Sequence, residues 1–218
     1  MAAGLPRARS LSISLPREGR PAATEALERL RFELFRGQLA EISGGPQRSA
    51  VLTFAFRVVR EAQAEGEPVA WILGRGSVFF PPDAAEAGVD LASLAVVRIP
   101  PAKRGVGADR MAALRAADVL IRSGGFGMVV LDLGRSPRLA LASQARLAKL
   151  AERHRALIAC LTESSVEEPS LGPLVSLRLE VARRSDDGSA WEARVLKDKR
   201  FGRQWRHEEV SRAPDGLR

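Results

Sequence analysis

The sequence LAEISGGPQRSAV, residues 39–51, combines a short apolar run, a glycine-rich turn and the start of an amphipathic helix. Leu39 to Ile42 predicts a buried strand, and Gly44 and Gly45 predict the turn that follows it. A long helix is expected from about 48 to 65, because apolar residues recur there at helical spacing. A strand, a glycine turn and a helix form the layout of a phosphate-binding loop, whose backbone N–H groups and helix N-terminus surround a phosphate.

The residues that make such a loop work are replaced here. The signature is Gly-x-x-x-x-Gly-Lys-Ser/Thr, in which the lysine neutralises the terminal phosphates and the hydroxyl ligates magnesium. Counted from Gly44, the second glycine is Ser49, the lysine is Ala50 and the hydroxyl residue is Val51. Each lost charge-assisted contact costs about 1.5–3 kcal/mol, so the two losses weaken nucleotide binding roughly 10²- to 10⁴-fold. Arg48 lies two positions before the missing lysine and could replace it only in part. We expect no ATP hydrolysis and no cofactor.

Outward from this stretch, apolar runs and helical patterns alternate along the chain. Strands are expected at 69–73, 94–99, 128–131 and 156–161, and helices at 83–87, 108–123 and 139–153. Such alternation predicts a parallel α/β sheet with helices on its faces. Residues 175–181 and 191–196 then alternate apolar and polar around a turn at Asp187-Gly188, which predicts an antiparallel hairpin. The predicted fold class is α/β, with a mostly parallel central sheet that ends in an antiparallel hairpin.

The chain divides into four expected parts. Residues 1–23 are rich in Pro, Gly, Ala, Ser and Arg and are expected to be a mostly disordered basic segment. Residues 24–36 are expected to form an N-terminal helix that stops at Gly37. The core is expected over 37–200, and a basic tail over 201–218. Within the first part, Leu11, Ile13 and Leu15 alternate with serines. That pattern is typical of a strand that joins a sheet edge, or of a few apolar residues in a disordered tail.

The net charge is +8, but its composition weakens a nucleic-acid interpretation. The basic residues are 30 Arg and 4 Lys, a bias that a GC-rich genome explains as readily as a selected surface. Cations and aromatic residues do gather near the C-terminus, a mixture suited to single-stranded nucleic acid. The candidates are Lys197, Lys199, Arg200, Arg203, Trp205 and Arg206. The alternative is the solvated end of a core strand.

Several classes of protein are not expected. The chain has no run of about 18 apolar residues, and residues 1–10 lack the apolar core of a signal peptide, so neither a membrane span nor secretion is expected. Its one cysteine, Cys160, lies in an apolar stretch, and the cytoplasm is the expected compartment. One cysteine and two histidines are too few for a structural zinc site, so no metal is expected. No Ser/His/Asp set suggests another enzyme site, so no catalytic residue is expected.

An ordered set of motifs resembles the core of the RecA-like recombinases. The set consists of segments 37–44, 65–72, 88–94, 122–132 and 194–199, which together span about three-quarters of the chain. Each motif alone is weak. In particular the sequence is similar to the degenerate bacterial relatives of the ImuA type, which are grouped with the cell-division inhibitor SulA. The resemblance implies a RecA-like three-layer core.

The resemblance also indicates where this sequence differs from that of an active recombinase. Asp132, at the end of an apolar strand, matches the magnesium-associated aspartate. The alternative is that this aspartate caps a turn or a helix, as a lone aspartate at a strand end often does. Arg75 stands where the recombinase has a catalytic glutamate. The two DNA-gripping loops are shortened to 134–138 and 163–169, and the second contains three glutamates, which repel phosphates. The resemblance therefore implies a pseudo-ATPase.

The ImuA type implies a function in the SOS response. Such a protein is expected to be a non-catalytic adaptor in damage-induced mutagenesis (translesion synthesis). It is expected to bind RecA and the ImuB-type Y-family polymerase relative, to reach an error-prone C-family polymerase indirectly, and to modulate RecA filaments by mimicking a protomer. The docking candidates are Leu11, Ile13, Leu15, Leu27, Leu30 and Phe35. The alternatives are a SulA-like inhibitor of cell division, or a recombinase paralogue that binds ATP or DNA weakly.

Overall fold

The computed structural model describes residues 31–45, 49–74, 77–101, 105–135, 138–165, 167–183, 190–200 and 206–210. In chain order, its elements are α2 (Phe32–Phe35), β1 (Leu39–Ser43), α3 (Ser49–Ala64), β2 (Val69–Leu73), α4 (Pro81–Glu86), the 3₁₀ helix η1 (Leu91–Ser93), β3 (Leu94–Arg98), α5 (Val106–Arg122), β4 (Met128–Gly134), α6 (Leu141–His154), β5 (Leu157–Thr162), β6 (Leu177–Arg183), β7 (Ala190–Asp198) and β8 (Arg206–Val210).

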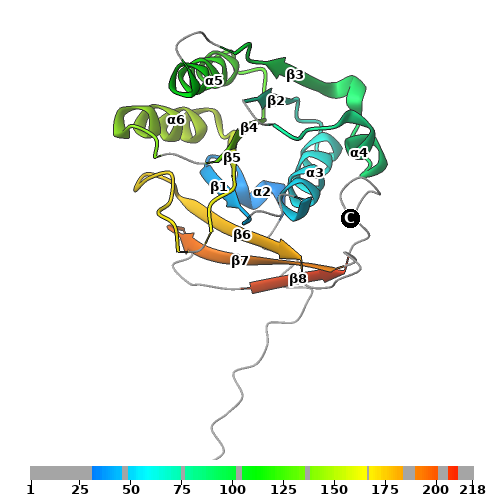
Figure 1. The fold of residues 1–218 in the computed structure, drawn as a ribbon. Coiled ribbons are helices and arrows are strands. Elements are labelled where there is room, and N and C mark those ends of the chain that lie inside the picture. The colour runs from blue at the N-terminus through cyan, green and yellow to red at the C-terminus, as the bar shows by residue number, and fades with distance from the viewer. Residues whose placement is uncertain are drawn as a thin grey trace, which may run out of the picture.

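Eight strands within the described ranges form one sheet, in the order β3-β2-β4-β5-β1-β6-β7-β8 (Figure 1). Every neighbouring pair from β3 across to β6 is parallel. The β6–β7 and β7–β8 pairs are antiparallel. The predicted fold class, a mostly parallel α/β sheet that ends in an antiparallel hairpin, is therefore confirmed.

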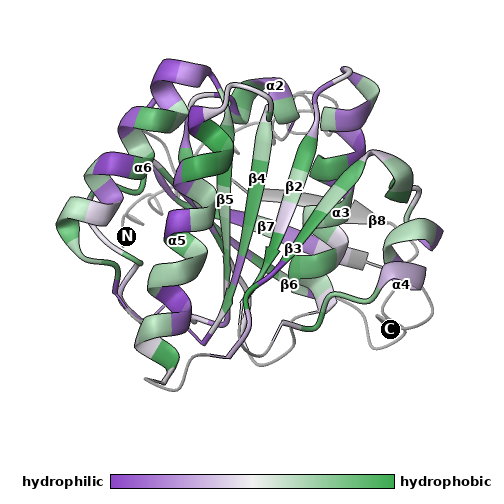
Figure 2. Cartoon of the chain, turned by 90° about the horizontal axis from the view of Figure 1, so that it is seen from above, coloured by the Kyte–Doolittle hydropathy of each residue, from purple (hydrophilic) through white to green (hydrophobic). Residues whose placement is uncertain are grey.

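Helices cover both faces of the sheet, which gives three layers (Figures 1 and 2). Because side chains alternate along a strand, β1 contributes to both layers of core. Ala40 and Ile42 pack in the cluster that contains α3, whereas Leu39 packs in the cluster that contains α5 and α6. Among the helices in the described ranges, none is both long and apolar enough to cross a lipid bilayer.

The inner strands are apolar because both of their faces are covered. All residues of β1, β2 and β5 are buried. The edge strand β3 differs, since Ala95, Val96 and Arg98 are exposed. Glycines follow the ends of α2 and α3 as predicted, with φ values of 72° at Gly37 and 77° at Gly66.

The chain differs from the predictions at its two ends. The sheet continues past residue 200 into β8, so part of the predicted tail is a strand paired with β7. Only α2 is described within the predicted helix 24–36, and the extended backbone of Arg31 precedes it, so the helix does not run unbroken through that residue. Residues 1–30, which include the predicted disordered segment, lie outside the described ranges, as does the predicted turn at 187–188.

The buried thiol of Cys160 gives a direct check of this core. Cys160 lies on β5 with no exposed surface, and burial and the nearby Glu41 carboxylate raise the pKa of its thiol. Because the thiolate is the reactive form, we expect a thiol reagent to modify Cys160 only after unfolding by denaturant. Titration with Ellman's reagent across a urea series measures this. Complete modification of the folded protein within minutes would contradict the described packing.

Candidate functional site

The strand, glycine turn and helix predicted from the sequence are present at the phosphate-loop position. Strand β1 ends at Ser43, Gly44 and Gly45 follow it, and α3 begins at Ser49. Residues 46–48, which include Arg48, lie outside the described ranges. This position is the carboxyl end of a parallel strand, the usual place for ligands in open α/β sheets.

Two of the three replaced residues of the loop lie in the apolar core. Ala50 and Val51 have no exposed surface and belong to the core cluster around α3. A Cβ built at Gly44 would lie 2.5 Å from Cγ2 of Val51 and 2.6 Å from the main-chain oxygen of Val181. Gly44 is therefore required by its close contacts with this chain, whether or not a phosphate binds.

An arginine that the sequence analysis did not identify lies at the start of α3. Arg183, on β6, donates from Nε to Oγ of Ser49 at 3.2 Å and from Nη2 to Oγ1 of Thr53 at 3.4 Å. Thr53 in turn donates to the main-chain oxygen of Ser49 at 2.9 Å. Partial burial lowers the pKa of Arg183. A cation thus occupies the end of the helix that favours anions, held by hydroxyls of the first turns.

Asp132, near the end of β4, is buried and hydrogen-bonds to residues that follow β2. Its Oδ2 accepts a hydrogen bond from Oγ of Ser77 at 2.5 Å. Its main-chain oxygen accepts from the N–H of Gly74 at 3.1 Å, and Ser77 N–H donates to the Gly74 oxygen at 3.2 Å. Arg75 lies outside the described ranges. Within those ranges, no three His, Cys, Asp or Glu side chains gather to hold a metal ion.

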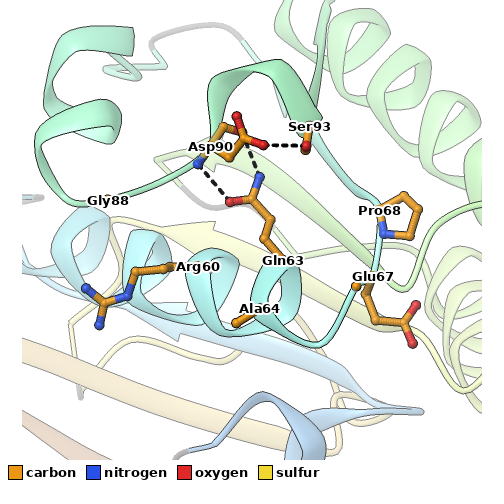
Figure 3. A pocket seen from close by; sticks show the side chains of 9 residues that line it. Arg60, Gln63, Ala64, Glu67, Pro68, Gly88, Asp90 and Ser93 are labelled. Atoms are coloured by element: carbon orange, nitrogen blue, oxygen red, sulfur yellow. Dashed lines mark hydrogen bonds between the residues drawn. The ribbon is translucent and has the colours of Figure 1, made fainter.

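A hollow lies at the C-terminal end of α3 (Figure 3). It has a volume of about 580 Å³ and is bordered by the segments that lead into β2 and β3. Gln63 and Asp90 exchange two hydrogen bonds there, of 2.8 and 2.9 Å. Hydrogen bonds from the Ser93 hydroxyl and the Ala92 N–H hold the pKa of Asp90 below its usual value. The Gln63 side chain therefore pairs with the main chain of Asp90 and connects α3 to the loop before β3.

The segments on either side of the acidic loop at 163–169 are anchored by a buried carboxylate. Glu41, in the middle of β1, has no exposed surface. Its carboxylate accepts hydrogen bonds from Ser170 Oγ at 2.6 Å, from Leu171 N–H at 3.1 Å and from Thr162 Oγ1 at 3.3 Å. Arg178 Nε lies 3.6 Å from Oε2 of Glu41. A charge buried in the sheet is thereby paired and hydrogen-bonded.

Arg178 and Gln144 complete this anchor. Arg178 Nη2 donates to the main-chain oxygens of Ser165 at 2.9 Å and Glu168 at 3.0 Å. Gln144, on α6, accepts from Leu174 N–H at 3.0 Å. The loop that the resemblance equated with a DNA-gripping loop is therefore fixed on its own sheet. Its residues 167 and 168 are exposed glutamates, which disfavour a phosphate backbone.

Two of the basic candidates near the C-terminus contact main-chain carbonyls. Lys197 donates to the Pro173 oxygen at 3.0 Å, and burial together with Lys199 lowers its pKa. Arg200 donates to the oxygens of Leu34 at 3.2 Å and Arg36 at 2.7 Å, which connects β7 to the end of α2. Lys199 is exposed. Arg203 and Trp205 lie outside the described ranges, as does the side chain of Arg206 on β8.

The docking candidates are divided by the described ranges. Leu11, Ile13, Leu15, Leu27 and Leu30 lie outside them. Phe35 is 4% exposed and packs against Phe54, with ring centroids 6.4 Å apart. Its side chain therefore lies in the domain's own core instead of on a surface open to a partner, a correction that helical periodicity alone could not supply.

Comparison with known proteins shows a likeness to RecA over part of the chain. A scan against models of protein families found no match. The chain is similar to Protein RecA of Chlorobium limicola, with 35% identity over 97 residues. This region covers 44% of the chain, and the chain spans about a quarter of the length of that curated relative. The match and the sheet support a distant RecA-like relationship, a coarser assignment than the ImuA type.

Substitution of the loop glycines separates packing from phosphate binding. We expect Gly44→Ala to lower the free energy of unfolding by about 1–3 kcal/mol, because the new methyl group would overlap Val51 and the Val181 oxygen. Gly45→Ala is the control, since a Cβ there meets nothing within 4 Å, and its effect should stay within about 0.5 kcal/mol. Urea unfolding measures both. Equal effects would show that Gly44 is not closely packed.

Substitution of Glu41 tests the anchor. We expect Glu41→Gln to cost about 3 kcal/mol of unfolding free energy, because Arg178 would remain buried without its carboxylate. Hydrogen exchange at the Leu171 and Leu174 amides should accelerate at the same time. Glu167→Gln, which removes an exposed carboxylate from the same loop, is the control. Unchanged protection of both amides in the Glu41 variant would contradict the anchoring role.

Proposed function

We propose that this protein is a non-catalytic RecA-like adaptor in the SOS response, which supports translesion synthesis by binding RecA and an ImuB-type Y-family polymerase relative. An error-prone C-family polymerase is reached indirectly, and RecA filaments are modulated by a protomer-like surface. The observation that carries this proposal is the start of α3, where the phosphate-loop layout persists without the groups that bind nucleotide.

Three contacts support a non-catalytic role. Val51 is buried against Gly44 at the position of the magnesium hydroxyl. Arg183 is hydrogen-bonded to the first turns of α3. Asp132 accepts a hydrogen bond from Ser77 and so already has a protein partner. A RecA relative with these features acts through binding to other proteins instead of through ATP hydrolysis.

The loop contacts favour protein partners over DNA as the main ligands. The acidic loop at 163–169 is fixed on the sheet by Glu41 and Arg178, and Arg200 is engaged by carbonyls of this chain. Weak binding of single-stranded DNA by Lys199 and the residues after it remains part of the proposal. Its strength should fall steeply with salt, because phosphate contacts release counterions.

A nucleotide titration tests the non-catalytic role. We expect no saturable binding of a fluorescent ATP analogue with magnesium up to millimolar concentration, with a RecA protein as the positive control. Saturation in the micromolar range would contradict the proposal and indicate a nucleotide-gated switch.

A truncation tests where RecA binds. We expect deletion of residues 1–30 to abolish RecA binding in biolayer interferometry while the domain remains folded, because Phe32 and Phe35 of the core are retained. Leu11→Lys with Ile13→Lys should have a similar effect, and Ser12→Lys with Ser14→Lys is the control with the same added charge. Full binding by the truncated protein would contradict docking through the N-terminal segment.

A pull-down distinguishes the partner classes. The full chain should retain RecA and the ImuB-type protein and should not retain the tubulin-like cell-division protein. Selective capture of the division protein would instead favour the SulA-like function.

A further inference from the structure

We propose that the surface between α5 and α6 is a docking groove for an acidic amphipathic helix of a partner protein. The two helices lie side by side on one face of the sheet (Figures 1 and 2). A groove of about 170 Å³ runs between them, and Leu114 and Leu147 form its buried floor. Met111, Arg115 and Arg146 form its walls. This surface is independent of the N-terminal docking described above.

The exposed ridge of α5 alternates between apolar and basic residues. Met111, Arg115, Val119 and Arg122 recur at spacings of three or four, which places them on one side of the helix. Met111 is 44% exposed and Val119 is 57% exposed. Exposed large apolar residues beside a groove are typical of a surface that a partner covers, and methionine adapts readily to a partner's shape.

The charge of the groove favours an acidic partner. Arg115, Arg122 and Arg146 surround one carboxylate, Asp118. Asp118 is bound by Arg146 through two hydrogen bonds and lies 3.2 Å from Arg122 Nε. The hydrogen bond from Arg146 lowers the pKa of Asp118, so the carboxylate stays ionised and neutralises only part of the surrounding charge. The remaining positive charge lies beside apolar side chains.

An amphipathic helix matches both properties. Its apolar residues, spaced by three or four, would contact Met111 and Val119, and flanking glutamates would face the arginines. Nucleic acid fits less well, because these two apolar side chains offer nothing to a phosphate and Asp118 repels it. The groove therefore fits a protein partner that presents a helix with a leucine-rich face bordered by carboxylates.

A fluorescent peptide tests the proposal on the full chain. The probe is a fluorescein-labelled synthetic helix with leucines at i, i+3, i+4 and i+7 and glutamates at the remaining positions. The reference peptide has lysines in place of the glutamates. We expect saturable binding of the acidic peptide in fluorescence anisotropy and no saturable binding of the lysine peptide. Binding of the acidic peptide should be weaker at about 300 mM than at about 50 mM salt, because salt screens the attraction between exposed charges.

Paired substitutions locate the binding surface. Met111→Asp with Arg115→Glu should weaken the affinity at least about tenfold, a loss of roughly 1.4 kcal/mol. Phe80→Asp with Arg60→Glu introduces the same acidic residues at two exposed positions, just before α4 and on α3, and should leave the affinity unchanged. The milder pair Met111→Ala with Arg115→Gln should weaken binding in the same direction and guards against misfolding, which circular dichroism monitors.

Four outcomes would overturn the proposal. They are equal affinity of the groove variant and the control variant, preference for the lysine peptide, and displacement of the acidic peptide by oligo-dT, which would indicate a nucleic-acid surface. The fourth is a concentration-dependent dimer that Met111→Asp with Arg115→Glu abolishes in sedimentation, which would identify the occupant as a second copy.

Discussion

A carboxylate in the middle of a buried parallel strand has to be satisfied by groups that fold over it, and Glu41 imposes this requirement on the chain. Its partners come from the end of β5, from the loop at 170–171 and from β6. Because Arg178 also holds the main chain at Ser165 and Glu168, this buried ion pair fixes the connection between β5 and β6 at several points. An uncompensated charge there would cost several kcal/mol, so the carboxylate requires these partners.

The phosphate-loop position combines a strand, a glycine turn and a helix with replaced signature residues. Gly44 packs against Val51 and the Val181 oxygen, where a Cβ would not fit. Packing alone therefore accounts for this glycine. What has changed is the set of charged and hydroxyl groups, with Arg183 now hydrogen-bonded at the helix end where an anion would be favoured.

Periodicity predicted the layers and the parallel sheet well, because the inner strands are apolar on both faces and the helices are amphipathic. It missed β8, whose sequence RHEEV has no alternation of apolar residues and whose strand depends on pairing with β7. Periodicity also missed the roles of Arg183, Ser77 and Arg178, because each side chain hydrogen-bonds to residues that are distant in sequence. Phe35 was assigned to a partner because helical spacing identifies an apolar face without indicating which surface covers it.

The fixed connection between β5 and β6 has a consequence for how such a protein is regulated. The connection is held on the sheet by Glu41, Arg178 and Gln144. On the proposed function, no cycle of nucleotide hydrolysis rearranges this connection. The output of the protein is then set by its concentration, so that synthesis and degradation switch the adaptor on and off.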